Sequence, residues 1–270
     1  MKQTTSKYLS GKDKSALIQM KRIALIIIFF MIANTSFGQS NSDKFVDETL
    51  EYSMHYGWID GGVATMSISE TMINDDTLIY IKMDARSTGI TDRLYKVRDI
   101  YESYVNPLTG LPVKAIRNIS EGGDKYYNEV SFHNDSNHVS SQKSGIIEVP
   151  DSTFDILSAV YSLRNSAIHS SLEIDSIIRL ETYFGDELFP LLLRYKGIET
   201  IKTELGKISC HNFSPVTEVG RVFKTEDDMT IWFSEDKNFI PVRVEFELFI
   251  GSLRCDLVSS SGLKHPLNIR

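Results

Sequence analysis

Apolar and polar residues alternate along most of this chain, and the pattern is clearest between residues 231 and 248. An apolar run ending in Trp232-Phe233 is followed by the polar sequence Ser-Glu-Asp-Lys-Asn at 234–238. The run after it alternates charged residues with four apolar ones, namely Val242, Val244, Phe246 and Leu248. A period of two places alternate side chains on a buried and a solvent-facing side of a strand. The segment is therefore predicted to form a β-hairpin.

The same alternation predicts about a dozen strands between residue 45 and the C-terminus. Most are separated by turns rich in Gly, Asn and Asp, and Asp60-Gly61-Gly62 is the strongest of these turn signals. Residues 88–98 break the pattern and mix aromatic with basic side chains. The expected strands are 45–57, 63–70, 78–85, 100–105, 112–119, 126–134, 138–142, 146–149, 176–184, 187–195, 199–204, 207–213, 230–233 and 242–257.

A helical period occurs once, in the middle of the chain. Phe154, Leu157, Val160 and Tyr161 are spaced as on one face of a helix. Asp151 or Ser152 is expected to cap this helix and Asn165 to end it. The predicted fold is all-β: a curved antiparallel sheet, forming a half-barrel or a partly closed barrel. The single mid-chain helix would cover or fill its concave side.

Residues 1–38 have the pattern of a signal peptide. The basic pair Lys21-Arg22 precedes about ten apolar residues at 23–32, too few to span a bilayer, which takes roughly 20. Small residues at Ser36 and Gly38 predict cleavage after Gly38, and Met20 is an alternative start that would make residues 1–19 an extension. No cysteine follows for a lipid anchor, so export to the periplasm is expected. We divide the rest into one β-rich domain, 39–262, and a C-terminal tail, 263–270.

The net charge of the chain narrows the classes of molecule that it is expected to bind. The whole chain has 29 basic and 36 acidic residues, a formal charge of −7. Residues 1–38 hold 6 of the basic and 1 of the acidic residues, so the rest has 23 and 35, a formal charge of −12. An acidic body argues against nucleic acid as a partner and against docking on anionic lipid heads. No transmembrane segment is expected in the mature chain.

Sites for covalent chemistry or metal binding are not predicted. The chain contains no serine-hydrolase elbow, no His-Glu-x-x-His sequence and no phosphate-binding loop, so we assign no catalytic residue, no metal ligand and no cofactor. Cys210 and Cys255 both lie in predicted strands. A disulfide between them is left open, and two buried free thiols are the favoured alternative.

A polar and aromatic cluster is the candidate ligand site. Arg side chains donate forked hydrogen bonds and Tyr rings offer flat apolar contacts with a polar tip, so together they suit an anionic or lipid-like molecule. The alternative is that these Tyr pack in the sheet and these Arg pair with nearby acids. The candidates are Arg93, Tyr95, Arg98 and Tyr101, with Tyr161 and Arg164 on the helix.

Several segments resemble the DUF3108 family of exported bacterial proteins. They are 51–57, 95–104, the run from 150 to 164 with its Asp-Ile-Leu-Ser-Ala sequence, and the run from 232 to 243. The resemblance implies a signal peptide and a β-rich domain, and it implies no established activity. The Phe-Gly-Gln junction at 37–39 is similar to exported proteins of Bacteroidetes-type bacteria. The expected architecture is similar, at the level of fold only, to the LolA/LolB half-barrels.

Three functions are compatible with these features. The leading hypothesis is a non-enzymatic periplasmic protein that binds an apolar or amphiphilic molecule, such as a lipid, in the concave face. The second is an envelope scaffold or assembly protein with a filled core, for which a protein partner in the envelope is expected. The third is an enzyme acting on envelope glycans or lipids. An empty apolar cavity of several hundred Å³ would favour the first, and a packed interior with exposed apolar residues would favour the second.

Overall fold

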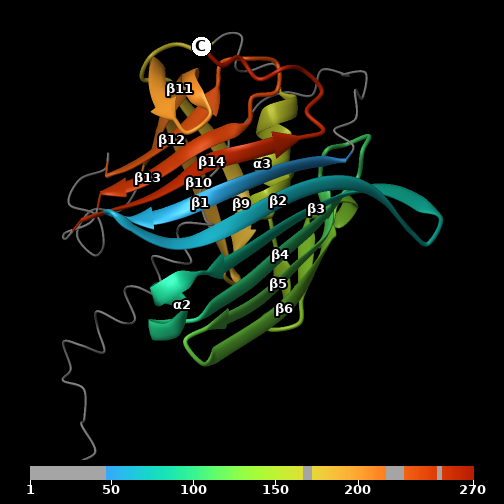
Figure 1. The fold of residues 1–270 in the computed structure, drawn as a ribbon. Helices are drawn as coiled ribbons and strands as arrows, with labels where there is room; N and C mark the ends of the chain where they lie inside the picture. Colours follow the sequence, from blue (N-terminus) through green and yellow to red (C-terminus); the bar gives the residue numbers. More distant parts are fainter. Residues whose placement is uncertain (1–46, 167–171, 217–227, 248–250) are drawn as a thin grey trace, which may run out of the picture.

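Fourteen antiparallel strands form one curved sheet in the computed structural model, which describes residues 47–166, 172–216, 228–247 and 251–270 (Figure 1). The structure confirms the predicted all-β fold. The predicted signal peptide lies outside the described residues. The strands are β1 Glu48–Tyr56, β2 Ile59–Ile73, β3 Asp76–Ser87, β4 Val97–Val105, β5 Pro112–Glu121, β6 Asp124–His133, β7 His138–Ser141, β8 Gly145–Glu148, β9 Ile177–Phe184, β10 Glu187–Thr203, β11 Gly206–Pro215, β12 Met229–Ser234, β13 Pro241–Glu247 and β14 Ser252–Ser261.

The first strand lies in the middle of the sheet. β1 pairs with β2 on one side and with β14 on the other, while every other strand pairs with its neighbours in the sequence. The sheet is therefore two meanders, β1–β8 and β9–β14, joined along the β1–β14 ladder. Its ends, β8 and β9, are not paired with each other, so the barrel is incompletely closed.

Alternation along the strands decides which side chains face inward. In β2, Ala64, Met66 and Ile68 are buried and the residues between them are partly exposed, as the period of two predicts. In the hairpin of β12 and β13, Val242, Val244 and Phe246 are buried, so this prediction is confirmed as well. Most inward side chains of both meanders form one apolar core, and a smaller separate cluster lies between β6, β7 and β9.

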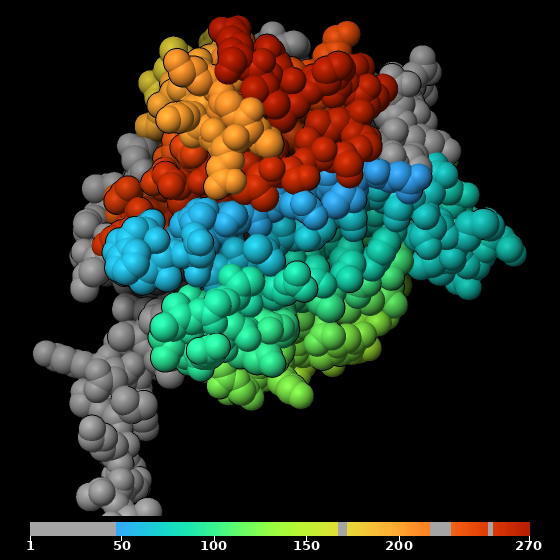
Figure 2. Space-filling model, in the orientation of Figure 1, coloured from blue at the N-terminus to red at the C-terminus, as the bar shows by residue number. Residues whose placement is uncertain are grey.

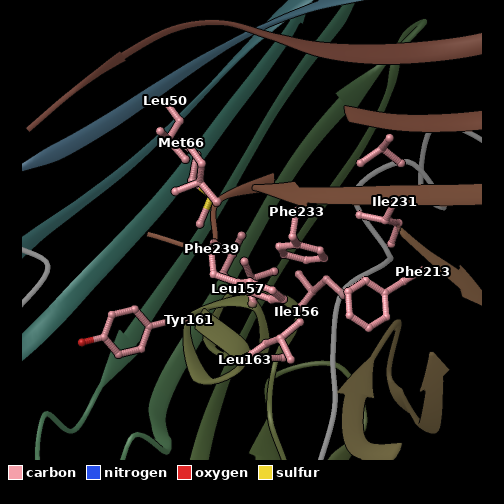
Figure 3. Packing of buried hydrophobic residues seen from close by; sticks show 14 of the residues in the cluster. Leu50, Met66, Ile156, Leu157, Tyr161, Leu163, Phe213, Ile231, Phe233 and Phe239 are labelled. Carbon is pink, nitrogen blue, oxygen red and sulfur yellow. The ribbon is translucent and has the colours of Figure 1, made fainter. Parts of the chain in front are cut away.

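The helix α3, Ile156–Asn165, fills the concave side of the sheet. All residues from Ile156 to Tyr161 are buried, and the helix packs against β3, β4 and β9. Figure 3 shows Ile156 and Leu157 directed toward the aromatic side chains of the second meander, where Phe233 and Phe239 stack with centroids 4.8 Å apart. The predicted position of the helix is confirmed.

The predicted cap of this helix was wrong. Asp155 is the N-cap: its carboxylate accepts hydrogen bonds from the backbone N–H groups of Leu157 and Ser158, and Ser158 completes a capping box. Phe154 comes before the helix and forms a bridge to β9, so the apolar pattern begins two residues ahead of the first helical turn.

Four further details differ from the sequence analysis. A short helix, α2 Gly89–Leu94, occupies the non-periodic segment before β4, and a 3₁₀ turn, η1 Asn134–Ser136, follows β6. The run predicted as one strand at 242–257 is two strands, β13 and β14. The end of the chain is attached to the sheet, because Ile269 bridges Ile208 and Arg270 exchanges two backbone hydrogen bonds with Lys207.

Candidate functional site

The two unpaired ends of the sheet meet at a junction that we call the seam. Phe154, six residues beyond the end of β8, receives a hydrogen bond at its carbonyl from the Tyr183 N–H, at 2.8 Å. Its own N–H donates to the carbonyl of Glu181, at 3.0 Å. The chain entering α3 thus attaches to β9 at this point, and a ladder between β8 and β9 is absent from the described sheet.

Asp186 joins the same two ends through its side chain. It lies in the turn between β9 and β10, and its carboxylate accepts hydrogen bonds from Asn128 Nδ2 at 2.6 Å, Ser144 Oγ at 2.9 Å and Ser141 Oγ at 3.1 Å. The Tyr126 hydroxyl is a fourth donor. One carboxylate from the second meander therefore holds β6 and the β7–β8 turn of the first.

A cleft opens along the seam between this turn and the start of α3. Its walls are mostly apolar and aromatic, and its cavity volume is about 30 Å³, room for about two water molecules. Around this cleft, the interior of the sheet is filled by α3 and the apolar core. We call the cleft the seam cleft and define it by Tyr101, Arg117, Asn128, Ile156, Phe184 and Asp186.

Arg117 is the cation of the seam cleft. Its guanidinium carbon lies 4.3 Å from the centroid of the Phe184 ring, 4.9 Å from that of Tyr126 and 5.8 Å from that of Tyr101, the range of cation–π contacts. Two polar atoms there have no hydrogen-bond partner in the described part of the chain: Arg117 Nε and the Tyr101 hydroxyl. Tyr101 is only 2% exposed, so its unused donor is buried at the cleft.

Two buried carboxyl groups lie next to this cation. Asp99 and Glu121 come from β4 and β5 and are 1% and 4% exposed. Burial raises the pKa of Asp99; the Ser120 amide, the Glu121 side chain and the charge of Arg117 oppose this rise. Asp99 therefore lies close enough to Arg117 for the two side chains to interact electrostatically.

The structure brings together only part of the predicted ligand site. Tyr101 lines the seam cleft, and Tyr95 lies near its acidic end, packed on Gly122. Arg98 pairs with Asp92 at 2.7 Å and Arg93 is exposed on α2, so these two candidates lie outside the seam cleft. The strand alternation explains it, because Arg98 and Tyr101 differ by an odd number of positions and face opposite sides of the sheet.

Arg164 and Tyr161, the helix residues of the prediction, have structural roles. Arg164 Nη1 and Nη2 donate to the two carboxylate oxygens of Glu48 at 2.7 and 2.8 Å, and its Nε donates to the Asn238 carbonyl at 3.2 Å. The side chains of this ion pair are 0% and 1% exposed. Tyr161 is buried in the core on the same helix. The alternative interpretation, in which such residues pack and pair, is the one that the structure supports for them.

Sequence reasoning missed Arg117 and Asp186. Arg117 had a readable signal, because it shares the inward alternation of β5 with Ala115 and Ile119, where a charged residue is out of place. Asp186 follows Gly185 and has the pattern of an ordinary turn. No local signal distinguishes it, since its partners are 42 to 60 residues away.

Other candidate chemistry is sparse in the described ranges. Cys210 is a buried free thiol and Cys255 is a partly exposed one, so the disulfide that was left open is not formed. Burial raises the pKa of both thiols to about 12. Among the residues outside the four gaps, no group of three His, Cys, Asp or Glu is placed to hold a metal ion, and no helix there is long and apolar enough to cross a membrane.

Comparisons with known proteins agree with the fold and leave the function open. A family model described as "Protein of unknown function (DUF3108)" matches residues 51–258. A beta-barrel-like DUF1849 protein from Brucella abortus is similar in structure, with a TM-score of 0.53 at 9% identity over 80% of this chain and 97% of that one. Lipoprotein LppX of Mycobacterium tuberculosis gives a TM-score of 0.26 at 13% identity over 97% of this chain and 100% of that one, and we draw nothing from it. No curated protein gives a significant match.

Proposed function

Because this chain belongs to the DUF3108 family, whose function is unknown, we propose from its structure that it is a non-enzymatic protein that binds an amphiphilic, lipid-like molecule at the seam cleft. The observation that supports this most is the combination found there. The walls are apolar and aromatic, and the two unused donors, on Arg117 and Tyr101, lie at the same place. Sites for small molecules typically combine an apolar lining with a few such polar groups.

The polar end of the ligand is assigned to Arg117. A guanidinium held among aromatic rings is partly desolvated, and it binds a carboxylate or phosphate more strongly than an exposed one does. The Tyr101 hydroxyl supplies a second donor at the same point. The ligand class is therefore an anionic head attached to an apolar body.

The structure corresponds to a closed form in this proposal. A cavity of about 30 Å³ has no room for an acyl chain, so the apolar part of a ligand enters only if the β9–β10 turn or α3 moves. The seam is where the sheet is weakest, since a bridge and the hydrogen bonds of Asp186 replace a ladder there. Entry along the seam breaks fewer backbone hydrogen bonds than entry anywhere else along the sheet.

The proposal includes export. The signal-peptide pattern of residues 1–38 supports a periplasmic location, and mass spectrometry of the protein from the cells that make it tests this. A mature chain beginning at Gln39 is expected. Recovery of the protein with residues 21–38 still attached would contradict it.

A scaffold or assembly protein is the second candidate. The specific observation that favours it is the packed interior, together with exposed apolar side chains such as Trp58, Leu94 and Leu108. A protein of this kind needs no ligand and works through its surface.

Native mass spectrometry separates the two candidates. Protein purified from its natural cells is expected to carry a bound amphiphile, which is then identified by lipid extraction. Arg117→Gln should weaken binding of a fluorescent fatty acid at least about tenfold, since a hydrogen bond from a charged group contributes roughly 1.5–3 kcal/mol. Lys114→Gln, on the opposite face of β5, is the matched control. If no small molecule co-purifies and Arg117→Gln binds the fatty acid as tightly as Lys114→Gln, the ligand proposal is wrong and the scaffold is favoured.

A further inference from the structure

Exposed apolar side chains gather at one end of the sheet, around the β1–β2 turn and α2. Trp58 is 91% exposed, Leu94 81% and Ile90 62%. A backbone hydrogen bond from Thr88 to Gly61 joins the two segments, and Figure 2 shows their atoms side by side on one face, in light blue and turquoise. Side chains of this size are rarely left in water together without a partner.

The same end of the molecule is cationic although the chain as a whole is acidic. Arg86, Arg93 and Lys96 are exposed, and none of them forms an ion pair within the described ranges. Of the nearby acids, Asp92 pairs with Arg98, and Asp60, whose side chain is 82% exposed, accepts a hydrogen bond from His55. We define the docking face as Trp58, Ile90, Leu94, Arg86, Arg93 and Lys96.

An unfavourable pairing in the sheet points to a negatively charged partner. Arg86 and Arg98 lie directly opposite each other in the β3–β4 register, an arrangement that destabilises a sheet. Asp92 accepts a hydrogen bond from Arg98, so it balances the charge of only one of these two residues. An anionic surface placed against the docking face would compensate the other.

We propose that the docking face binds the surface of an anionic lipid bilayer. Trp, Ile and Leu beside Lys and Arg are the side chains of proteins that lie at the interface, where the apolar groups enter the headgroup region and the cations meet lipid phosphates. Each basic residue near such a surface adds to the electrostatic attraction. The net charge predicts repulsion from anionic lipid, so binding depends on this uneven distribution of charge. The docking face and the seam cleft share no residue, and either proposal can fail without the other.

Trp58 itself reports the binding. Protein purified after export is mixed with vesicles of phosphatidylglycerol and phosphatidylethanolamine, or of phosphatidylcholine alone. The chain has two Trp, and Trp232 is buried, so a blue shift of the emission comes from Trp58. The shift is expected with the anionic vesicles, much weaker with the neutral ones, and reduced by added salt.

Variants distinguish vesicle binding through the docking face from nonspecific adsorption through exposed apolar residues. Trp58→Ser/Leu94→Ser and Arg93→Gln/Lys96→Gln should each reduce the vesicle-bound fraction in sedimentation at least fivefold. Leu108→Ser is the matched control, since Leu108 is 88% exposed but lies at the other end of β4. Three results would each overturn the proposal: no shift with anionic vesicles, equal binding to neutral ones, or equal loss of binding in Leu108→Ser. Binding to a protein from the same cells without any binding to vesicles would do so as well.

Discussion

At the scale of single residues, the most consequential feature is a charge placed where water does not reach. Arg164 is fully buried on α3 and meets Glu48 at the start of β1 in a bidentate ion pair. The pair holds the helix to the middle strand of the sheet. Each charge is tolerated only because the other is present, since an isolated buried ion is strongly unfavourable.

Removing one member of this pair should lower the free energy of unfolding more than removing both members does. Arg164→Met is expected to lower the free energy of unfolding by about 3–5 kcal/mol, because it leaves Glu48 buried and charged. The double variant Arg164→Met/Glu48→Leu should recover much of the loss. Urea unfolding measures both. Arg179→Met, which breaks an exposed pair with Glu181, is the control and should cost less than about 1 kcal/mol. A loss in the double variant as large as in Arg164→Met would contradict this account.

The cysteines should be unreactive in the folded protein. Burial raises the pKa of Cys210 and Cys255 to about 12, so the thiolate form, which is the nucleophile, is scarce at pH 8. A thiol reagent is expected to label both residues much more slowly in native protein than in urea, and the partly exposed Cys255 before Cys210. Native labelling of either thiol within minutes, or the absence of free thiols in urea, would show that one is accessible or that they are bridged.

At the scale of elements, the N-terminus of α3 is fixed by one carboxylate. Asp155 caps the helix and also accepts a hydrogen bond from Ser103 Oγ of β4, at 2.6 Å. The same side chain therefore starts the helix and attaches it to the sheet.

Asp155→Ala is expected to lower the free energy of unfolding by about 2 kcal/mol, more than a cap alone, because the Ser103 hydroxyl also loses its partner. Asp151→Ala is the matched control. It removes an exposed carboxylate that the sequence suggested as the cap, and it should change stability by less than about 0.5 kcal/mol. Thermal unfolding compares the two, and equal effects would contradict the assignment of the cap.

Strands and helices were predictable where the periodic pattern of apolar residues extends over many positions. Strands such as β2 and the helix α3 follow directly from periods of two and 3.6. The helix α2 was not predictable, because six residues with no buried member leave no period to detect. The cap was misplaced because Phe154 fits the helical spacing yet bonds to β9, and spacing alone does not distinguish these two environments.

At the scale of the whole molecule, closure of the sheet rests on a few contacts at the seam. Asp186→Ala removes the acceptor of four side-chain hydrogen bonds between the two meanders. Hydrogen exchange is expected to become faster in β7, β8 and the β9–β10 turn and to stay unchanged in β1, β2 and β14. Asp124→Ala, an exposed carboxylate at the start of β6, is the control. Faster exchange throughout the sheet would mean that Asp186 supports global stability and does not act at the seam alone.

The candidate site was less predictable than the fold for a physical reason. Alternation tells which face a side chain occupies, and it does not tell which distant strand lies opposite. Tyr101 was found because it stands in a distinctive aromatic run, while Phe184 and Asp186 reach it only through the meeting of two sheet ends that are far apart in the sequence. The pairing of β1 with β14 has the same origin, since no local pattern names a partner about 200 residues away.

That pairing sets an order of events during synthesis. All the other ladders join strands that follow each other, so they can form while the chain is still emerging. The edge of β1 that faces away from β2 has no partner strand until Ser252–Ser261 has left the ribosome or the translocation channel. Until then the two meanders lack the ladder between β1 and β14, and the arrival of β14 turns them into one continuous sheet.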